Sequence, residues 1–526
     1  MPKVKINDVE IEVPAGTNMI EAAKLAGFDI PHYCYHPHLS IAGNCRMCMC
    51  EAETPRGPVL EIACNMQARE GLAIRTESDK VKAVRKSVME FLLVNHPLDC
   101  PICDQSGECR LQDYYMDHGQ YDSRGIEAKV GKHKRQDIGD LIVLDAERCV
   151  QCSRCVRFGD EVTGTGDLRL MNRGDHTEIG MFPGTRLEHD YQGNLADICP
   201  VGALTNKDFR FERRVWYLRE TDSVCTGCST GCNTKVCHQE GEVFRTLPRR
   251  NDDVNRSWMC DPGRQCNSGV GSLDRILRPT VDGVAVPDAF ETLAARIKAA
   301  GAGRTGFVMG SGASLEANWA LLQVVKANCP GAKVFSVAGN NAGAIAKSDG
   351  LLMDADKNPN SAGVALLAAW FGGIGGAEDL RAADLSLLVV LEDDIITRLG
   401  GNPAEAIAYF GTHNNPTAEL ASIVIPVAHV VEMDATYVNR QERVQRVRRA
   451  TNPQGEAVPA YQALEKLGAA LGRAPGTSMP TATFSAMARA VPRMNGLDYK
   501  ALGASGRLLA PTVQPVAPAA PVAEAK

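Results

Sequence analysis

The alternation of apolar and polar residues predicts the first elements of the chain. Lys3–Ile6 and Val9–Val13 alternate on either side of Asn7-Asp8, residue types that favour a tight β-hairpin. Asn18–Ala26 follows as a short helix that ends at Gly27. Two strands, a helix and then a cysteine-rich loop suit a small β-grasp domain.

A longer amphipathic helix is predicted over Lys80–Asn95. Its apolar residues follow the three- and four-residue spacing of one helix face, at Val81, Val84, Val88 and Phe91. The helix is expected to end at His96-Pro97, because proline disfavours the helical conformation of the residue before it.

After about residue 275 the pattern changes to short apolar runs with helical patterns between some of them. The runs are Gly306–Met309, Val334–Val337, Leu385–Leu391 and Ile423–Val427, and one helical pattern is Ser314–Ala327. This alternation is typical of an α/β fold with a mostly parallel sheet. The end of the chain is nearly all Pro, Ala and Val over Pro511–Lys526, a composition that predicts a disordered tail.

Composition narrows the functional classes. A chain of 526 residues with 44% hydrophobic residues suggests three or four domains with real cores, and a net charge of −6 does not favour nucleic acid or an anionic membrane surface. The longest charge-free stretch, Gly363–Gly376, is too short to cross a bilayer, and the N-terminus has no secretory signal.

Cysteine use is the anomaly in this composition. Eighteen of the 19 cysteines precede residue 270. In a long chain without a secretory signal, clustered thiols predict metal ligands in a reducing compartment, which favours a cytoplasmic location.

The first ligand group is Cys34-x10-Cys45-x2-Cys48 with a distant fourth cysteine, Cys64. One isolated cysteine, a close pair and a remote partner suit a 2Fe–2S cluster. Spacing alone leaves Cys50 open as the fourth ligand, because Cys48 and Cys50 share a face if the backbone is extended there. A zinc site is the alternative.

The second group is His96-x3-Cys100-x2-Cys103-x5-Cys109. An imidazole in place of one thiolate removes a negative charge from the ligand set and should raise the reduction potential of a cluster. A zinc site with three cysteines and one histidine is the alternative here.

The remaining two groups are cysteine triplets with a remote fourth cysteine. Their members are Cys149, Cys152, Cys155 and Cys199 before Pro200 in the third group, and Cys225, Cys228, Cys232 and Cys260 in the fourth. Closely spaced triplets favour 4Fe–4S clusters, whereas zinc sites normally use separated pairs. A zinc ribbon is the alternative for the fourth group.

Cationic residues are interleaved with the ligands, at Arg46, Arg110, Arg148, Arg154 and Arg157. Because a thiolate-ligated cluster is anionic, such cations would stabilise its reduced form; solvated surface charges are the other interpretation. We assign no role to the remaining cysteines and to the histidines near the first group, Cys50, Cys237, Cys266, Cys329, His32, His36 and His38.

With these residues in view, the chain resembles the large iron–sulfur subunit of respiratory NADH:quinone oxidoreductase (complex I). The resemblance covers residues 1 to about 450 and is most specific over the first 270. Residues 414–446, NNPTAELASIVIPVAHVVEMDATYVNRQERVQR, look like the end of a molybdopterin-oxidoreductase fold. The α/β region is shorter than that of the family.

The resemblance implies one 2Fe–2S and three 4Fe–4S clusters on the four groups, and it favours Cys64 over Cys50. It implies a multidomain fold, α+β and α/β, with a degenerate molybdopterin-type region. The expected parts are a 2Fe–2S β-grasp ferredoxin domain at 1–79, a histidine-ligated 4Fe–4S segment at 80–120, a 4Fe–4S ferredoxin-like domain at 121–217, a 4Fe–4S domain at 218–274, the α/β domain at 275–505 and a disordered tail at 506–526.

The resemblance implies an electron relay from a flavin subunit that binds NADH toward a ferredoxin-like subunit and quinone, with no substrate site in this chain. The fourth cluster is expected to lie off this relay, in a structural role. The expected partners are these and other subunits of the peripheral arm, and the expected place is the cytoplasmic side of the inner membrane.

Three other functions compete with the relay. A molybdenum enzyme such as a formate dehydrogenase needs a soft ligand after the fourth group, and Cys329 is the only candidate. An iron hydrogenase needs several further cysteines, and a structural zinc protein is disfavoured by the triplets. Gly310-Ser311-Gly312 lacks a third glycine in register and is interpreted as a strand-to-helix turn, not as a nucleotide loop.

Overall fold

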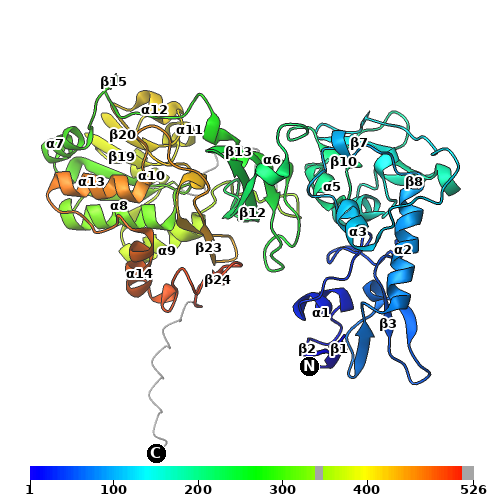
Figure 1. Ribbon diagram of the computed structural model, residues 1–526. Helices are drawn as coiled ribbons and strands as arrows, with labels where there is room; N and C mark the ends of the chain where they lie inside the picture. Colours follow the sequence, from blue (N-terminus) through cyan, green and yellow to red (C-terminus); the bar gives the residue numbers. More distant parts are fainter. Residues whose placement is uncertain (338–347, 512–526) are drawn as a thin grey trace, which may run out of the picture. The chain divides into compact units, whose positions relative to one another are not determined.

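The structure is a computed structural model that describes residues 1–337 and 348–511. The chain divides into two compact units, Met1–Leu218 and Arg219–Lys526 (Figure 1). The predicted domains at 1–79, 80–120 and 121–217 fall in the first unit. Most of the predicted tail, 512–526, lies outside the described residues, whereas Arg507–Leu508 form a strand, so that regular structure extends past residue 505.

The first unit begins with a five-stranded sheet in the order β2-β1-β5-β3-β4. Its strands are β1 (Lys3–Ile6), β2 (Val9–Glu12), β3 (Met49–Ala52), β4 (Val59–Ile62) and β5 (Leu72–Arg75). The β1–β2 hairpin and the parallel β1–β5 pair, packed on helix α1 (Met19–Leu25), give the predicted β-grasp arrangement. Asn18 caps α1 by accepting a hydrogen bond from the Ile20 N–H.

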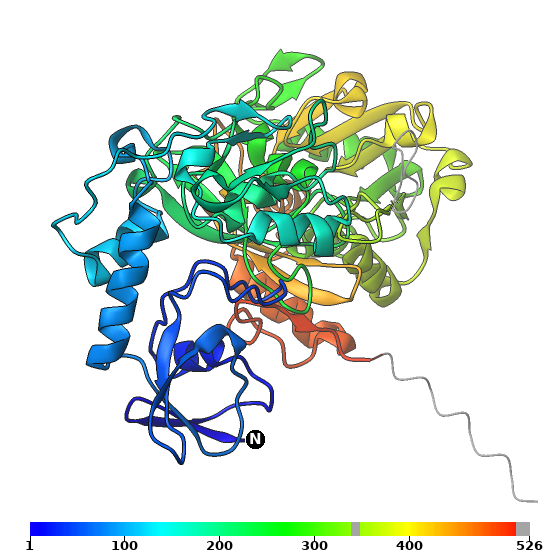
Figure 2. The ribbon, with the colours of Figure 1, turned by 90° about the vertical axis from the view of Figure 1, so that its right-hand side faces the viewer.

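Helix α2 (Asp79–Leu93) leads away from this sheet and is the predicted amphipathic helix (Figure 2). Ser78 caps it by accepting a hydrogen bond from the Val81 N–H. It is followed by α3 (Arg110–His118), by the sheet β10-β7-β6 and by the short helices and strands that carry the third ligand group. These elements are β6 (Gln136–Asp137), β7 (Ile142–Leu144), α4 (Arg154–Phe158), β8 (Arg169–Met171), β9 (Glu178–Gly180), α5 (Gly193–Ile198) and β10 (Leu204–Asn206).

The second unit opens with an antiparallel sheet that the sequence pattern did not reveal. Its strands are β11 (Arg219–Val224), β12 (Asn233–Gln239) and β13 (Glu242–Pro248), followed by α6 (Asp261–Arg264). A second small sheet joins β22 (Ala435–Val438), β23 (Arg443–Val447) and β24 (Arg507–Leu508).

The main sheet of this unit has the order β15-β14-β21-β20-β19-β16-β17-β18. The strands β16 to β21 pair in parallel, as predicted, and β14 and β15 add an antiparallel edge. Their bounds are β14 (Thr280–Val281), β15 (Val284–Ala285), β16 (Thr305–Met309), β17 (Lys333–Ser336), β18 (Ile374–Gly375), β19 (Leu387–Leu391), β20 (Ala406–Gly411) and β21 (Ile423–Pro426). The order of the strands reverses between β16 and β19, as in doubly wound folds.

Helices cover both faces of this sheet (Figure 1). One face packs on α7 (Phe290–Ala300), α8 (Leu315–Asn328) and α13 (Ala460–Leu471), with α9 (Ser361–Phe371) and α14 (Pro480–Ala490) behind them. The other face packs on α10 (Ala377–Arg381), α11 (Ile395–Leu399) and α12 (Pro416–Leu420). This is the expected α/β architecture. Gly310-Ser311-Gly312 is the strand-to-helix turn between β16 and α8.

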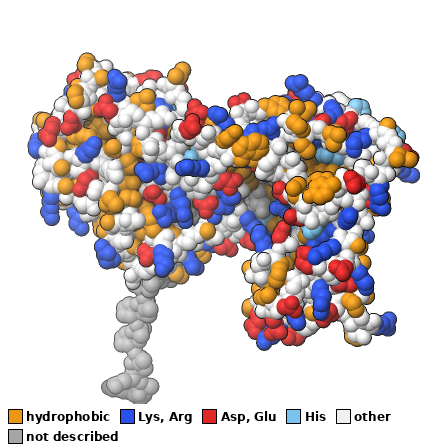
Figure 3. Space-filling view, in the orientation of Figure 1, with side chains coloured by type: hydrophobic (Ala, Val, Ile, Leu, Met, Phe, Trp, Pro, Cys, Tyr) orange, Lys and Arg blue, Asp and Glu red, His pale blue; other side chains and the backbone are white. Residues whose placement is uncertain are grey.

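Basic and acidic side chains are interspersed over the face shown in Figure 3. In the part of the chain that the structure describes, no helix combines the length and the apolar character needed to cross a bilayer.

Candidate metal centres

The first group gathers at the edge of the β-grasp core. Cys34, Cys48 and Cys64 are buried and Cys45 is half-buried. Hydrogen bonds from Cys45 and Cys64 lower the pKa of Cys34, and a hydrogen bond from Cys64 lowers that of Cys48. The four sulfurs therefore form one contiguous group, and thiolates of this kind are the form that binds iron.

Cys50 is directed to a different partner. Its thiol donates to the Glu61 carbonyl oxygen at 3.6 Å, across the β3–β4 pair, and burial raises its pKa to about 12. The fully buried Arg85, which sequence reasoning did not single out, interacts electrostatically with Cys48 and Cys50 and donates to the Met49 carbonyl oxygen at 3.1 Å. The structure thus brings Cys64, not Cys50, to the group that contains Cys34.

The second group lines a cavity of about 850 Å³ beside α2 and α3. His96, Cys100, Cys103 and Cys109 all face it, together with Arg148. Burial lowers the pKa of His96 to about 4, so that its imidazole is neutral at pH 7, the form that binds metal. Burial raises the pKa of Cys109 to about 11.

One wall of this cavity is built from glycine. A Cβ atom added at Gly202 would overlap Cys103 Sγ. Only glycine lets the backbone approach the candidate ligand so closely.

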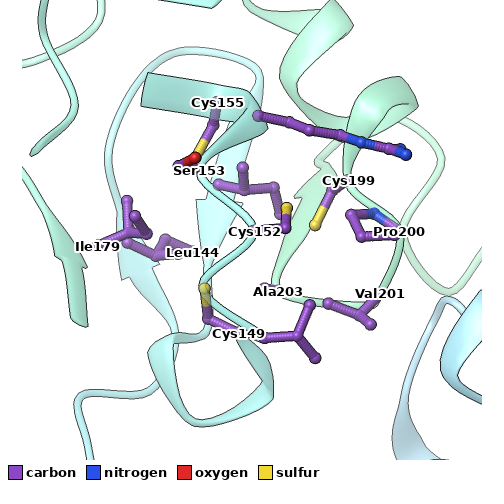
Figure 4. A pocket seen from close by; sticks show the side chains of 13 residues that line it. Leu144, Cys149, Cys152, Ser153, Cys155, Ile179, Cys199, Pro200, Val201 and Ala203 are labelled. Carbon is purple, nitrogen blue, oxygen red and sulfur yellow. The ribbon is translucent and has the colours of Figure 1, made fainter. Parts of the chain in front are cut away.

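The third group surrounds an enclosed space of about 20 Å³. Figure 4 shows the sulfurs of Cys149, Cys152, Cys155 and Cys199 directed toward a common hollow, with Pro200 beside Cys199. Between the ligands, Gln151 and Ser153 have positive φ angles of 52° and 58°, which turn the loop around the hollow. Arg154, 6% exposed, also lines it.

The chemistry of the third group suits an anionic iron–sulfur cluster. Burial raises the pKa of Cys149 and of Cys199 to about 12, so these thiols become thiolates only when a cation replaces their protons. The Gln151 N–H donates to Cys149 Sγ at 3.3 Å, and Arg154 Nε is buried without a hydrogen-bond partner among the described residues. Such N–H donors match the acceptor sulfurs of a cluster.

The fourth group lies in the second unit, between β11 and α6. Cys225, Cys228, Cys232 and Cys260 are buried and close enough to raise one another's pKa, beside the larger effect of burial. A Cβ at Gly263 would lie 3.1 Å from Cys260 Sγ and 3.3 Å from Cys225 Sγ.

A fifth thiol adjoins this group. Cys266, to which the sequence gave no role, makes a hydrogen bond with Cys225 that raises the Cys225 pKa. Its position six residues after Cys260 carries no recognisable ligand spacing, so the sequence offered no signal for it.

Direct contacts join three of the groups inside the first unit. Arg157 Nη2 donates to the carbonyl oxygens of Cys34 at 2.6 Å and Cys152 at 3.2 Å, linking the first group to the third. The Arg110 N–H, next to Cys109, donates to the Pro200 carbonyl oxygen at 3.1 Å and links the second group to the third. The third group therefore lies between the other two.

Within residues 1–337 and 348–511, no three His, Cys, Asp or Glu side chains converge tightly enough to hold a single metal ion. The four groups are thus defined by which side chains neighbour one another, and not by a preformed coordination geometry.

Five family models match consecutive parts of the chain. They are a 2Fe-2S iron-sulfur cluster binding domain at residues 2–79, the NADH-ubiquinone oxidoreductase-G iron-sulfur binding region at 85–124, the ferredoxin-like domain of NADH-quinone oxidoreductase subunit 3 at 139–205, the NDSU1/NuoG-like 4Fe-4S domain at 218–268 and molybdopterin oxidoreductase at 385–470. Each of the first four contains one of the groups described above.

Two curated relatives agree with these models. The NuoG-type subunit of NADH-quinone oxidoreductase from Rickettsia prowazekii is 39% identical over 327 residues, 61% of this chain and 48% of the relative. The mitochondrial NADH dehydrogenase [ubiquinone] iron-sulfur protein 1 of Solanum tuberosum is 42% identical over 281 residues, 53% of this chain and 38% of the relative. The chain is a homologue of the NuoG-type subunit. It matches about half or less of the length of these relatives.

Among solved structures, a chain of an NAD⁺-reducing [NiFe]-hydrogenase is 29% identical, with 41% of this chain and 91% of that chain covered at a TM-score of 0.36. The likeness is too low to carry a structural argument. The assignment to the NuoG type therefore rests on the family models and the curated relatives.

Proposed function

We propose that this chain is an electron-relay subunit of a NADH:quinone oxidoreductase, with one 2Fe–2S cluster on the first group and 4Fe–4S clusters on the other three. The observation that carries the proposal is the pair of contacts at Arg157 and at Arg110. They place three groups of candidate ligands in one contiguous series inside one compact unit.

The series has a physical order that differs from the order along the chain. Since the third group contacts both others, electrons would pass from the first group to the third and then to the second. Bound clusters supply the one-electron chemistry. The chain supplies the spacing, buried sulfurs that are shielded from water, and N–H and guanidinium donors that favour added negative charge.

The fourth group has a separate position in this proposal. It belongs to the second unit, so we place it outside the series and assign it a structural role there. Metal binding at Cys260 would tie α6 to the β11–β12 turn that carries the triplet, because the remote cysteine and the triplet are held by different elements.

The proposed partners follow from the relationship to the NuoG-type subunit. The first group would receive electrons from a flavin subunit that binds NADH, and the second would pass them to a ferredoxin-like subunit and on to quinone. The proposed place is peripheral, on the cytoplasmic side of the inner membrane, among the other subunits of the peripheral arm.

The molybdenum alternative finds little support in the second unit. Its one candidate ligand, Cys329, is 3% exposed at the end of α8 and packs in the main hydrophobic core. Burial raises its pKa, which disfavours the thiolate that a metal requires.

Iron and zinc analysis with low-temperature EPR, on anaerobically purified and dithionite-reduced chain, tests the cofactors. The proposal expects about fourteen irons per chain, since one two-iron and three four-iron clusters are implied. About ten irons with zinc at the fourth group would retain the relay and retire that cluster. Stoichiometric zinc without an EPR signal would refute the proposal.

The place of the third group in the series is tested by Cys152→Ala. This variant should lose one 4Fe–4S signal and abolish quinone reduction by the assembled complex. Cys329→Ala is the matched control, because it removes a buried cysteine that belongs to no group. Quinone reduction that survives in Cys152→Ala would take the third group off the path.

A further inference from the structure

One guanidinium nitrogen joins the backbones of two candidate ligands from different groups. Arg157, in α4, donates from Nη2 to the Cys34 carbonyl oxygen at 2.6 Å and to the Cys152 carbonyl oxygen at 3.2 Å. Cys34 belongs to the first group and Cys152 to the third. A single nitrogen atom therefore connects the two carbonyls.

Further hydrogen bonds fix the position of this guanidinium. Arg157 Nε donates to Ser153 Oγ at 3.3 Å, and Nη1 donates to the Ser40 carbonyl oxygen. The side chain is half-buried, and all three nitrogens of its planar fork donate, to four acceptors in total. Charge-assisted bonds of this kind hold a geometry more strongly than neutral ones do.

A second tie between the same two loops runs beside it. Arg154 Nη1 donates to the Ile198 carbonyl oxygen at 3.0 Å, next to Cys199, and Nη2 donates to the Tyr35 carbonyl oxygen, next to Cys34. Asn44 Nδ2 also donates to the Gln151 carbonyl oxygen at 3.1 Å. The loop of the first group is therefore locked to the loop of the third.

We propose that Arg157 is a positioning residue for electron exchange between the first and third groups, through the bonds that it makes to Cys34 and Cys152. In each exchange one electron leaves the first group and one arrives at the third; no covalent bond forms or breaks, and no proton is needed. This inference rests on the relay function proposed above. It adds a role for one side chain that ligates nothing.

The geometry separates this role from that of a positive charge alone. A lysine would keep the charge, but a single ammonium group lacks the fork that reaches Ser40, Ser153 and both cysteine carbonyls. Arg157→Lys therefore separates the loss of these hydrogen bonds from the loss of charge, and Arg157→Met removes both. Arg169→Met is the control, because Arg169 is exposed and pairs only at the surface, with Asp160 at 2.8 Å.

The test uses the full chain with its clusters loaded and iron counted. EPR measures the magnetic interaction between the reduced first and third clusters and their potentials, and rapid photochemical reduction with a deazaflavin measures the rate of electron equilibration between them. In Arg157→Met the interaction should weaken and the rate fall several-fold with full iron content. In Arg157→Lys the rate should also fall while both potentials stay near those of the wild type.

Other outcomes are distinct. A wild-type rate and magnetic interaction in either loaded variant would overturn the role of Arg157, and so would equal losses in Arg169→Met. If Arg157→Met fails to load iron, Arg157→Lys decides alone. Absence of the first or third cluster from the wild-type chain would refute the relay function itself.

Discussion

The buried guanidinium of Arg154 should set the reduction potential of the third cluster. Arg154 is 6% exposed and lines the hollow that Cys149, Cys152, Cys155 and Cys199 surround. Its two Nη atoms are bound to backbone carbonyls, whereas its buried Nε has no hydrogen-bond partner within the described residues. Arginine stays charged when buried, so Arg154→Met removes one positive charge and one free donor.

The magnitude follows from the charge that reduction adds. A hydrogen bond to a charged group is worth about 1.5–3 kcal/mol. Since a one-electron couple shifts by about 59 mV for each tenfold change in equilibrium, this energy corresponds to a potential lower by about 60–130 mV. Full Coulomb attraction at close range would be larger, about 4 kcal/mol at 4 Å with an effective dielectric constant of 20, so we take the smaller figure.

Potentiometric EPR on the loaded chain measures this shift. Arg154→Met should lower the potential of the third cluster by this amount and that of the first by less, because Arg154 reaches the first group only through the Tyr35 carbonyl. Arg154→Lys should restore part of the shift, and Arg169→Met should leave both potentials unchanged. A third-cluster potential in fully loaded Arg154→Met that equals the wild-type value would refute the reasoning.

Three further predictions address other sites. His96→Cys adds a negative ligand and should lower the potential of the second cluster; potentiometric EPR that shows no change would contradict the ligand assignment. Gly202→Ala places a Cβ against Cys103 Sγ and should cost the second cluster its iron, whereas Gly131→Ala, whose Cβ would meet only Glu147 Oε1 at 3.5 Å, should retain it. Burial raises the pKa of Glu316 from 4.5 to about 7, so the second unit should lose stability as pH rises from about 4.5 to 7, by about 3 kcal/mol, and stay level above pH 7. Calorimetry of Glu316→Gln should show this part of the pH dependence removed; an unchanged profile would exclude Glu316 as its source.

Local signals in the sequence predicted the elements well. The caps at Asn18 and Ser78 mark the starts of α1 and α2, and the four apolar runs after residue 275 became β16, β17, β19 and β21. These features depend on neighbours a few residues apart, which periodicity and capping describe directly. The β11–β13 sheet escaped notice because its polar and apolar residues mix with the cysteines and its turn at Glu240-Gly241 was not weighed.

The relation between the ligand groups was beyond the reach of spacing. Cysteine intervals identify a triplet, because its members sit on one loop, but they say nothing about which loop a remote cysteine joins. The choice of Cys64 over Cys50 depends on strand pairing, since Cys50 faces Glu61 across β3–β4. The approach of Cys34 to Cys152 through Arg157 likewise depends on tertiary folding.

This division between local and remote ligands has a consequence for how the clusters and the fold depend on each other. In the third group the triplet lies on one loop, while Cys199 follows α5 and is held near it by Arg154 through the Ile198 carbonyl. A cluster bound there would close a long loop, and the entropy that this removes from the unfolded chain grows only slowly with loop length. Most of the coupling must therefore come from the deprotonation and binding of the buried thiols themselves, which the unfolded chain cannot offer in one place. Arg154 and Arg157 act on both sides of this balance, because the bonds that position the loops for electron exchange also assemble the ligands.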